Sequence, residues 1–449
     1  MRPKILIVIS SSFHLRSVLH SGVLDGIDES FEVVLAIEND LLSGLPVIKQ
    51  RIFPYSTSRL NHKISNFLMD SGTWKYRNRS SSFQYRIKRR LLGDIPFHEL
   101  NLTNKAKFPF RFTKNLARYL LLGNSLINYI LRLLSQCIQA REHQIRNILS
   151  EAKPDIVLIW SQTLDSASSA FIYLSREFAI PHVLIADNWD NLFSKSVFPI
   201  KPDFVGCFGE QSAQFGSKLH DIPKNRFIVL GSARYDVYRN LPKVHFRRLI
   251  IFAGSSMPED DEYILKLMDQ VRADSDTRTS SQILSWRYRP HPVPQHRVSS
   301  FIDSFPKIEF TNRTSQVGEN QWPDLVDSVV ELANTRVAIC MPTSYLLEAL
   351  VCEVPVIIPV FDEMVGLTSS KTLMNSLAHL KDIENLPGVF IANSPSEFID
   401  QLTNLMEQEV RIPPTEHLDY FINWSQGSFL ENLIAMIEDI TTKSPKFHI

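Results

Sequence analysis

The alternation of short apolar runs with helix-length segments most constrains how this chain of 449 residues can fold. Six runs in the first half have the length and apolar character of buried strands. They are Ile5–Ile9, Phe31–Ile37, Asp155–Trp160, His182–Ala186, Phe204–Phe208 and Arg226–Leu230. Because helical segments separate most of them, these runs predict a parallel sheet with right-handed crossovers.

A second series of six apolar runs follows in the other half of the chain. They are Leu249–Ala253, Gln282–Tyr288, Ile308–Phe310, Val337–Met341, Val356–Val360 and Gly388–Ala392. The predicted fold is therefore of the α/β class, with two Rossmann-like parallel-sheet domains facing a cleft. We expect domains over residues 1–240 and 241–415, and a C-terminal helical segment, 416–449, that packs back across both.

An insertion at about residues 45–118 is strongly basic, although the whole chain has zero formal net charge. Between residues 51 and 118, fifteen Lys or Arg residues stand against three acidic residues. We expect this insertion to lie outside the sheet and to lead into a long helical stretch, roughly Leu116–Ser150, whose apolar residues recur at helical spacing.

The cations Arg86, Lys88, Arg89 and Arg90 in this insertion are interleaved with aromatic residues. This combination suits an anionic, partly apolar membrane surface. No nucleic-acid-binding motif accompanies the cations, so nucleic acid is not the expected partner, while a merely solvated insertion stays open as an alternative.

The cellular location follows from the termini and the cysteines. The chain passes at once into an apolar run too short for a signal peptide, and no run is long enough to span a membrane. The four cysteines form no CxxC pair and have no metal-ligand spacing. These features predict a cytoplasmic protein, with any membrane contact peripheral and no bound metal or cofactor.

Polar residues that could bind a ligand or take part in catalysis follow several of the predicted strands, and ligands bind at this place in doubly wound sheets. Thr343 and Ser344 precede a helix, whose free backbone N–H groups favour phosphate oxygens. Glu348 lies one turn further on an apolar face and needs a partner, such as the hydroxyls of a bound sugar. A simple capped helix with Glu348 at the surface is the alternative.

Two other strands of the second half also end in candidate donor-binding residues. Arg289 and His291 lie in an Arg-Pro-His-Pro loop, and proline on each side of the histidine fixes its backbone. Gly254 and Ser255 form a possible phosphate loop, but acidic residues 259–262 follow and already neutralise that helix start. We therefore expect phosphate at Thr343 and Ser344, and close backbone approach at Gly254.

In the first half, a general base for an acceptor hydroxyl has two sources. His14 follows the first strand, and imidazole titrates near neutral pH. Asp187 and Asp190 follow a later strand, together with Trp189 and Asn191, which would contact an acceptor sugar. The alternatives are a helix-capping histidine and a loop whose Asp and Asn residues bond to one another.

The motif Arg289-Pro-His-Pro, followed by Pro342-Thr-Ser and then Glu348-Ala-Leu, resembles the C-terminal half of GT-B glycosyltransferases. The resemblance extends to sialyl- and Kdo-transferases of bacterial surface polysaccharide synthesis and to CDP-glycerol glycerophosphotransferases. It implies that His291, Thr343 and Ser344 contact the donor phosphates and that Glu348 contacts the ribose. The acidic pair before glycine that supplies the base in many sialyltransferases is matched only in part, by Asp25 and Gly26.

The expected activity is metal-independent transfer of a sugar from a nucleotide-sugar donor to a membrane-associated glycan or glycolipid acceptor. Three alternatives stay open at this point. They are CDP-glycerol-type polyol-phosphate transfer, UDP-sugar 2-epimerisation, and a non-catalytic scaffold of a polysaccharide assembly complex.

Overall fold

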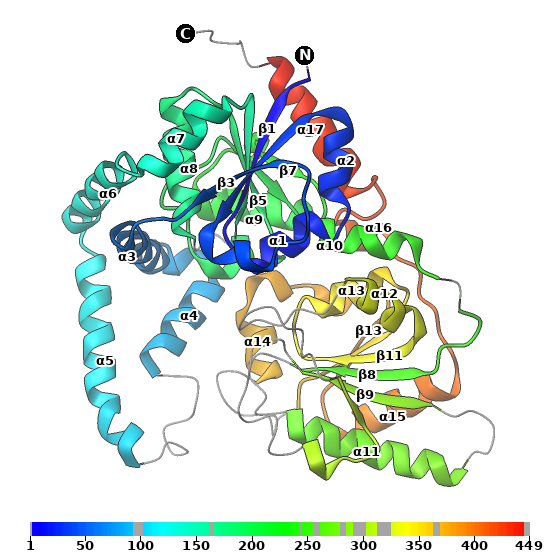
Figure 1. The fold of residues 1–449 in the computed structure, drawn as a ribbon. Helices are drawn as coiled ribbons and strands as arrows, with labels where there is room; N and C mark the ends of the chain where they lie inside the picture. Colours follow the sequence, from blue (N-terminus) through cyan, green and yellow to red (C-terminus); the bar gives the residue numbers. More distant parts are fainter. Residues whose placement is uncertain are drawn as a thin grey trace. The chain divides into compact units, whose positions relative to one another are not determined.

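The computed structural model describes residues 2–92, 102–161, 165–242, 244–254, 261–278, 284–290, 302–311, 325–361 and 369–443. These residues form two compact units (Figure 1). The first unit contains the described residues up to Asp236 and those from Asp419 onward, and the second contains those of Val237–Leu418.

Within the described residues, the first unit holds a seven-stranded sheet in which every pairing is parallel, with the order β3-β2-β1-β4-β5-β6-β7. Its strands are β1 (Lys4–Ile9), β2 (Glu32–Glu38), β3 (Arg51–Tyr55), β4 (Ile156–Ser161), β5 (His182–Ala186), β6 (Phe204–Cys207) and β7 (Phe227–Val229). The strand order reverses between β1 and β4. The carboxyl ends of those two strands therefore mark the place where doubly wound sheets bind ligands.

Helices cover both faces of this sheet, which is why β1 and β4 are apolar throughout their buried parts rather than alternating. The helices are α1 (Ser12–Leu19), α2 (Val23–Ser30), α3 (Arg59–Lys75), α4 (Ser81–Leu92), α5 (Leu102–Leu122), α6 (Ser125–Gln139), α7 (His143–Ala152), α8 (Ser166–Glu177), α9 (Glu210–His220), α10 (Ala233–Asp236) and α17 (Phe429–Lys443). Figure 1 shows α7 and α8 on one face and α2 and α17 on the other.

The last helix, α17, completes the core of the first unit. Its side chains Phe429, Leu433 and Ile437 are buried in the same apolar cluster as the residues of β1 and β2. The helix packs against α2 and α10. The C-terminal segment thus supplies part of the apolar face against which the first strands fold.

The second unit holds, among its described residues, a six-stranded parallel sheet with the order β10-β9-β8-β11-β12-β13. Its strands are β8 (Leu249–Ala253), β9 (Ser285–Arg289), β10 (Glu309–Phe310), β11 (Thr335–Cys340), β12 (Val356–Pro359) and β13 (Val389–Ala392). Its helices are α11 (Asp261–Arg278), α12 (Leu325–Asn334), α13 (Tyr345–Val351), α14 (Ser370–Ser376) and α15 (Pro395–Glu407), and α16 (Glu416–Asp419) follows where the chain returns to the first unit. In Figure 1, α11 and α15 cover one face of this sheet and α12 and α13 the other.

The prediction of two parallel α/β sheets is confirmed, and each of the twelve predicted runs lies at a strand of the described structure. The prediction that the basic insertion lies outside the sheet is wrong at its start, because β3 pairs with β2. Pro54 lacks an N–H donor, which suits an edge strand and made this run look unlike a strand.

The predicted helical stretch over residues 116–150 consists of three helices, which are the end of α5, the whole of α6 and most of α7. Gly123 ends the first of these close to the ring of Trp74, where a Cβ would come within 2.8 Å of the indole nitrogen. Asn124 then caps α6, with its side-chain oxygen accepting from the N–H groups of Leu126 and Ile127. No helix in the described parts of the chain is both long and apolar enough to cross a bilayer.

Candidate active site

His14 lies at the carboxyl end of β1, in the first turn of α1. Ser11 caps this helix, and its hydroxyl oxygen accepts from the backbone N–H of His14 at 3.2 Å. The cap fixes where the helix begins and so directs the imidazole into the unit, where the residue is only 1% exposed. His14 is therefore a buried histidine next to the point where the strand order reverses.

A chain of hydrogen bonds determines which ring nitrogen of His14 carries the proton. The Ser10 hydroxyl donates to Oδ2 of Asp165 at 2.5 Å, and Ser10 Oγ lies 3.2 Å from Nδ1 of His14. Since serine has one hydroxyl proton and gives it to the carboxylate, Nδ1 must be the donor to Ser10. Nε2 of the neutral ring then has a free lone pair, which is what a general base requires.

Nε2 of His14 faces a second carboxylate, that of Asp187, directly after β5. The distance from Nε2 to Oδ2 of Asp187 is 3.8 Å, too long for a hydrogen bond. Neither atom has a hydrogen-bond partner among the described residues, although both side chains are almost fully buried. Buried polar atoms without partners are rare in proteins, and a bound hydroxyl would donate its one proton to one of these two acceptors.

Burial raises the pKa of Asp187 above its ordinary value, while nearby His14 and Arg234 partly offset the shift. Arg234, from α10, lies with its guanidinium carbon 4.5 Å from the ring centre of Phe13. It also donates to the side-chain oxygen of Asn188 at 3.2 Å. A fixed cation thus lies beside the buried carboxyl.

A third carboxyl group, that of Glu38, ends the neighbouring strand β2. Burial, with the charges of Asp165 and Asp40 contributing further, raises the pKa of Glu38 to about 7. A carboxylic acid with this pKa can give or take a proton at neutral pH. The ends of β1, β2, β4 and β5 therefore gather one imidazole and three carboxyl groups at one edge of the sheet.

Our sequence predictions missed Ser10, Glu38 and Asp165. Glu38 directly follows the predicted strand Phe31–Ile37, and Asp165 caps α8 a few residues after β4. Considering the residues that follow every predicted strand would have found both. No sequence signal shows that Ser10 connects Asp165 to the imidazole.

The three other residues predicted near Asp187 bond within their own surroundings. Asp190 pairs with Lys195 at 3.0 Å and accepts from the Ser194 hydroxyl at 2.8 Å. Trp189 is buried, and its indole N–H donates to Gln211 at 3.1 Å. Asn191 is buried and donates to the carbonyl of Ser161 at 3.2 Å. These contacts favour the alternative of a closed loop for these three residues and leave Asp187 in the site.

The donor-binding candidates Gly254, Arg289 and Thr343 lie at the carboxyl ends of the adjacent strands β8, β9 and β11. His291 and Ser255 lie outside the described residues. Thr343 and Ser344 are half-buried just before α13, and the Ser344 side chain does not cap this helix. At Gly254 the close approach is to the protein itself, since a Cβ would come within 2.2 Å of Oδ2 of Asp261.

Arg289 and Glu348 both have protein partners. Burial lowers the pKa of Arg289, but Glu331, 2.9 Å away, more than offsets this and the pKa is raised. The guanidinium also lies 4.7 Å from the ring centre of Tyr345. Glu348 accepts from the hydroxyl of Tyr238 at 2.8 Å, so a protein hydroxyl takes the place that we expected a sugar to fill.

Two of the four basic residues predicted to meet a membrane also make internal contacts. Arg86 donates to the Ser194 carbonyl at 3.2 Å, and burial lowers its pKa. Arg90 pairs with the buried carboxylate of Asp70. Lys88 is exposed, and Arg89 is partly exposed.

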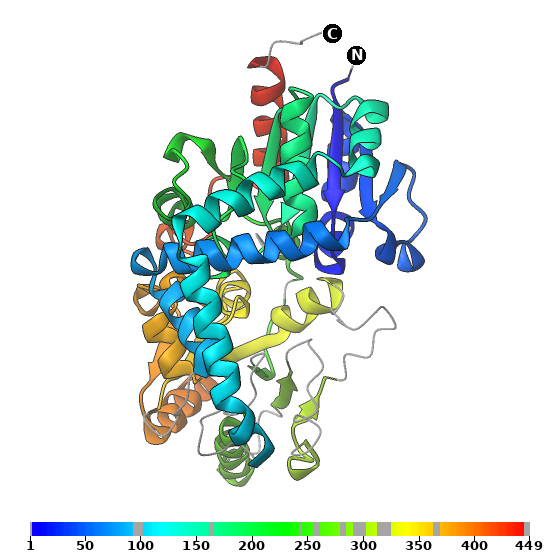
Figure 2. The ribbon, with the colours of Figure 1, turned by 90° about the vertical axis from the view of Figure 1, so that its left-hand side faces the viewer.

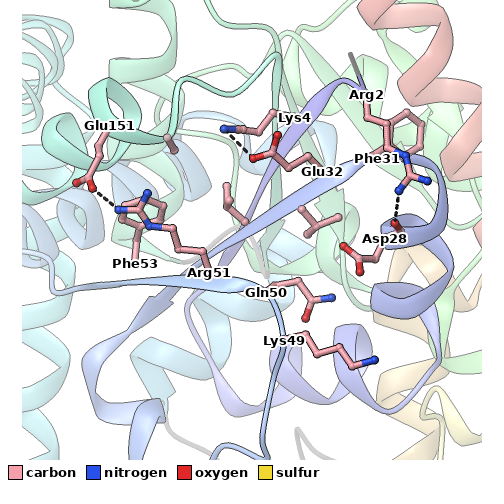
Figure 3. A pocket seen from close by; sticks show the side chains of 13 residues that line it. Arg2, Lys4, Asp28, Phe31, Glu32, Lys49, Gln50, Arg51, Phe53 and Glu151 are labelled. Atoms are coloured by element: carbon pink, nitrogen blue, oxygen red, sulfur yellow. Dashed lines mark hydrogen bonds and ion pairs between the residues drawn. The ribbon is translucent and has the colours of Figure 1, made fainter.

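A groove of about 540 Å3 lies at the opposite edge of the first sheet, near the amino ends of β1, β2 and β3 (Figure 3). Its charges are largely paired: Lys4 lies 2.8 Å from Glu32, and Arg51 pairs with Glu151. Parallel sheets bind ligands at their carboxyl ends, so this groove is not the candidate active site. In the described part of the chain no cluster of three His, Cys, Asp or Glu side chains could hold a metal ion.

Comparison with known proteins identifies the fold. No family model and no curated protein sequence matches this chain. A structure from Listeria monocytogenes, described as a UDP-N-acetylglucosamine 2-epimerase, is similar with a TM-score of 0.56 and 11% identity over 100% of both chains. The UDP-GlcNAc 2-epimerase of Methanocaldococcus jannaschii gives a TM-score of 0.52 and 11% identity, over 97% of this chain and 99% of that one.

A glycosyltransferase of kitacinnamycin is similar as well, with a TM-score of 0.51 and 12% identity over 98% of this chain and 100% of that one. Both kinds of protein have the GT-B fold, and this chain shares that fold. At these identities the likeness concerns the fold, and any activity has to be argued from the site.

Proposed function

We propose that this protein is a glycosyltransferase that moves a sugar from a nucleotide-sugar donor to a hydroxyl group of a membrane-associated glycan or glycolipid acceptor. The observation that supports this most directly is the buried imidazole of His14, with its proton on Nδ1 and with no hydrogen-bond partner for Nε2 among the described residues. Its position at the reversal of strand order is where a GT-B enzyme would need a base.

In the proposed reaction, the acceptor hydroxyl donates a hydrogen bond to Nε2 of His14. As the acceptor oxygen bonds to the anomeric carbon of the sugar, its proton passes to Nε2, and the bond from that carbon to the donor phosphate oxygen breaks. The imidazolium so formed lies 3.8 Å from Asp187 and is linked through Ser10 to Asp165. Two carboxylates thus stabilise the charge that develops in the transition state.

The leaving nucleotide phosphate remains assigned to the second unit, at the carboxyl ends of β8, β9 and β11. We propose Thr343, Ser344 and His291 for this contact, as the sequence predicts, while Arg289 and Glu348 contact Glu331 and Tyr238 within that unit. Helix N–H groups and side-chain donors suit phosphate oxygens. No metal ion is required in this scheme.

Sugar 2-epimerisation is the second candidate, and Glu38 favours it. Removing a proton from one side of a carbon and returning one to the other side needs two proton-transfer groups. His14 and Glu38, whose pKa is raised to about 7, would provide them at one edge of the sheet. The similar epimerase structures make this alternative worth a direct test.

The test is to incubate the protein with a panel of UDP-, CMP- and CDP-activated donors and membrane extract, and to follow nucleotide release and sugar configuration. Transfer releases the nucleotide in step with acceptor modification. Epimerisation conserves the nucleotide sugar and, in deuterated water, labels the inverted carbon. A panel with neither reaction and no nucleotide binding would instead support a scaffold.

Replacement of His14 by Gln or Ala is expected to lower turnover by about 10²- to 10⁴-fold, the usual contribution of a general base. Nucleotide affinity should be unchanged, because the donor contacts that we propose belong to the other unit. His20→Ala is the matched control, since His20 is exposed at the end of the same helix. Full turnover in folded His14→Gln would remove His14 from the mechanism.

A further inference from the structure

Helix α6 buries two polar side chains and exposes a row of large apolar side chains. Ser135 and Gln139 are buried, and the Gln139 amide donates to the Ser135 hydroxyl at 2.8 Å. Large apolar side chains face outward instead: Leu126 is 66% exposed, Tyr129 60%, Ile130 46%, Leu133 43% and Leu134 46%. A surface helix normally buries its apolar side, so this arrangement points to a covering partner.

The outward side chains of α6 form one continuous face. At 100° per residue, Leu126, Tyr129, Ile130, Leu133 and Leu134 fall within an arc of about 140°. Cys137 lies in the same arc and is exposed, whereas the other three cysteines are buried. The inner side of the helix packs against α3 and α8.

Helix α5, before the turn at Gly123, also has exposed apolar side chains. Phe110 is 74% exposed, Leu120 63% and Leu121 59%. Phe110, Lys114 and Leu121 share one side of the helix, because four and eleven residues correspond closely to whole turns. Figure 2 shows α5 and α6 in front, on the side of the first unit that faces the viewer.

The charge of the two helices is entirely of one sign. Residues 102–139 contain no Asp or Glu. The cations in this span are Lys105, Lys107, Arg111, Lys114, Arg118 and Arg132. Arg118 pairs with Asp70 on α3, while Lys107, Arg111, Lys114 and Arg132 are exposed. Exposed apolar side chains therefore occur together with unbalanced positive charge.

We infer that the outer face of α5 and α6 docks on a lipid bilayer that contains acidic lipids, with the apolar side chains of α6 in the headgroup boundary and the cations on lipid phosphates. A second copy of the chain would bring like charges together across a two-fold axis. Nucleic acid would match the cations but would leave the apolar side chains in water. The inference moves the membrane surface from Arg86 and Arg90, which make internal contacts, to these two helices.

The test uses a polarity-sensitive fluorophore on Cys137, the exposed cysteine of this face. Adding vesicles of phosphatidylcholine with phosphatidylglycerol should shift the emission to the blue, and vesicles of phosphatidylcholine alone should shift it far less. Cosedimentation of the unlabelled protein should show the same preference and should weaken with added salt.

The triple variant Leu126→Ser, Ile130→Ser, Leu133→Ser should reduce binding to acidic vesicles by about tenfold or more, because it removes apolar area from the docking face. The matched control replaces Leu60, Phe246 and Val330, exposed apolar residues elsewhere, with Ser and should bind as the natural sequence does. Nucleotide affinity of the triple variant should be unchanged, so the result is independent of the proposed catalysis.

Three outcomes would overturn the inference. Equal vesicle binding by the triple variant and the natural sequence would show that this face of α6 does not bind the membrane. A fluorescence shift that appears on raising protein concentration without lipid, and disappears in the triple variant, would identify a second copy as the partner. Binding to nucleic acid in preference to acidic vesicles would identify a nucleic-acid surface.

Discussion

The carboxyl edges of the two sheets differ in whether their buried ionisable groups are paired with other protein groups. In the second unit, Arg289 is paired with Glu331 and Glu348 accepts from Tyr238. In the first unit, Oδ2 of Asp187 and Nε2 of His14 lie 3.8 Å apart, and neither atom has a hydrogen-bond partner among the described residues. A paired edge stabilises its own fold, whereas an unpaired edge keeps polar atoms available for a ligand at a cost in stability.

The directions of the pKa shifts express the same difference. At the second edge the pKa of Arg289 is raised, because Glu331 outweighs the effect of burial, so folding favours the charged form. At the first edge burial raises the pKa of both Asp187 and Glu38, so folding disfavours their charged forms. Mutations at the two edges should therefore change stability in opposite directions.

The largest effect is expected for Glu331→Gln in the second unit. Arg289 is 8% exposed, and loss of its carboxylate partner would leave a buried charge unpaired. We expect the free energy of unfolding to fall by about 3–5 kcal/mol, measured by urea denaturation. The control is Glu309→Gln, whose exposed pair with Arg287 should contribute about 0–1 kcal/mol. Equal losses of unfolding free energy in Glu331→Gln and Glu309→Gln would contradict a stabilising role for the buried pair.

A smaller loss is expected for Tyr238→Phe, which removes the hydroxyl that donates to Glu348. Hydrogen bonds to charged groups contribute about 1.5–3 kcal/mol, and the lower end applies because Glu348 is partly accessible to water. Thermal denaturation would measure the change against Tyr129→Phe, at an exposed tyrosine. Tighter nucleotide binding by Tyr238→Phe would show that Glu348 belongs to the donor site and that the Tyr238 hydroxyl bonds to it in the free protein.

The smallest effect, of opposite sign, is expected for Glu38→Gln in the first unit. The pKa of Glu38 is raised from 4.5 to about 7, so the unfolded chain releases this proton at lower pH than the folded protein. Stability from this group is complete below about pH 4.5 and is lost as the pH rises to about 7. Because the carboxyl is partly exposed, the loss should be no more than about 1 kcal/mol.

Glu38→Gln should therefore raise the free energy of unfolding above about pH 7 and flatten its dependence on pH, as urea denaturation at several pH values would show. Glu29→Gln, at an exposed glutamate on α2, is the control and should change neither. A destabilised Glu38→Gln at alkaline pH would mean that the two edges do not differ in the way described.

Two of the predicted site residues lie near the ends of strands, where we expected them. His14 comes a few residues after the apolar run of β1 and Asp187 directly after that of β5, and the carboxyl ends of parallel strands meet at one edge. Glu38 was not among our predicted site residues, although it directly follows the predicted strand Phe31–Ile37. β3 was not among our predicted strands. It contains Pro54, and proline is rare in strands other than edge strands.

The order of apolar runs by itself determined the two parallel α/β sheets, because strands buried on both faces must be apolar throughout and helices must connect them. Tertiary structure alone decided which polar groups have partners: Glu331 reaches Arg289 from α12, and Tyr238 reaches Glu348 across 110 residues of sequence. It also decided which side of α6 faces out. Periodicity shows that a helix has an apolar side, but only the packing of its neighbours determines whether that side is buried.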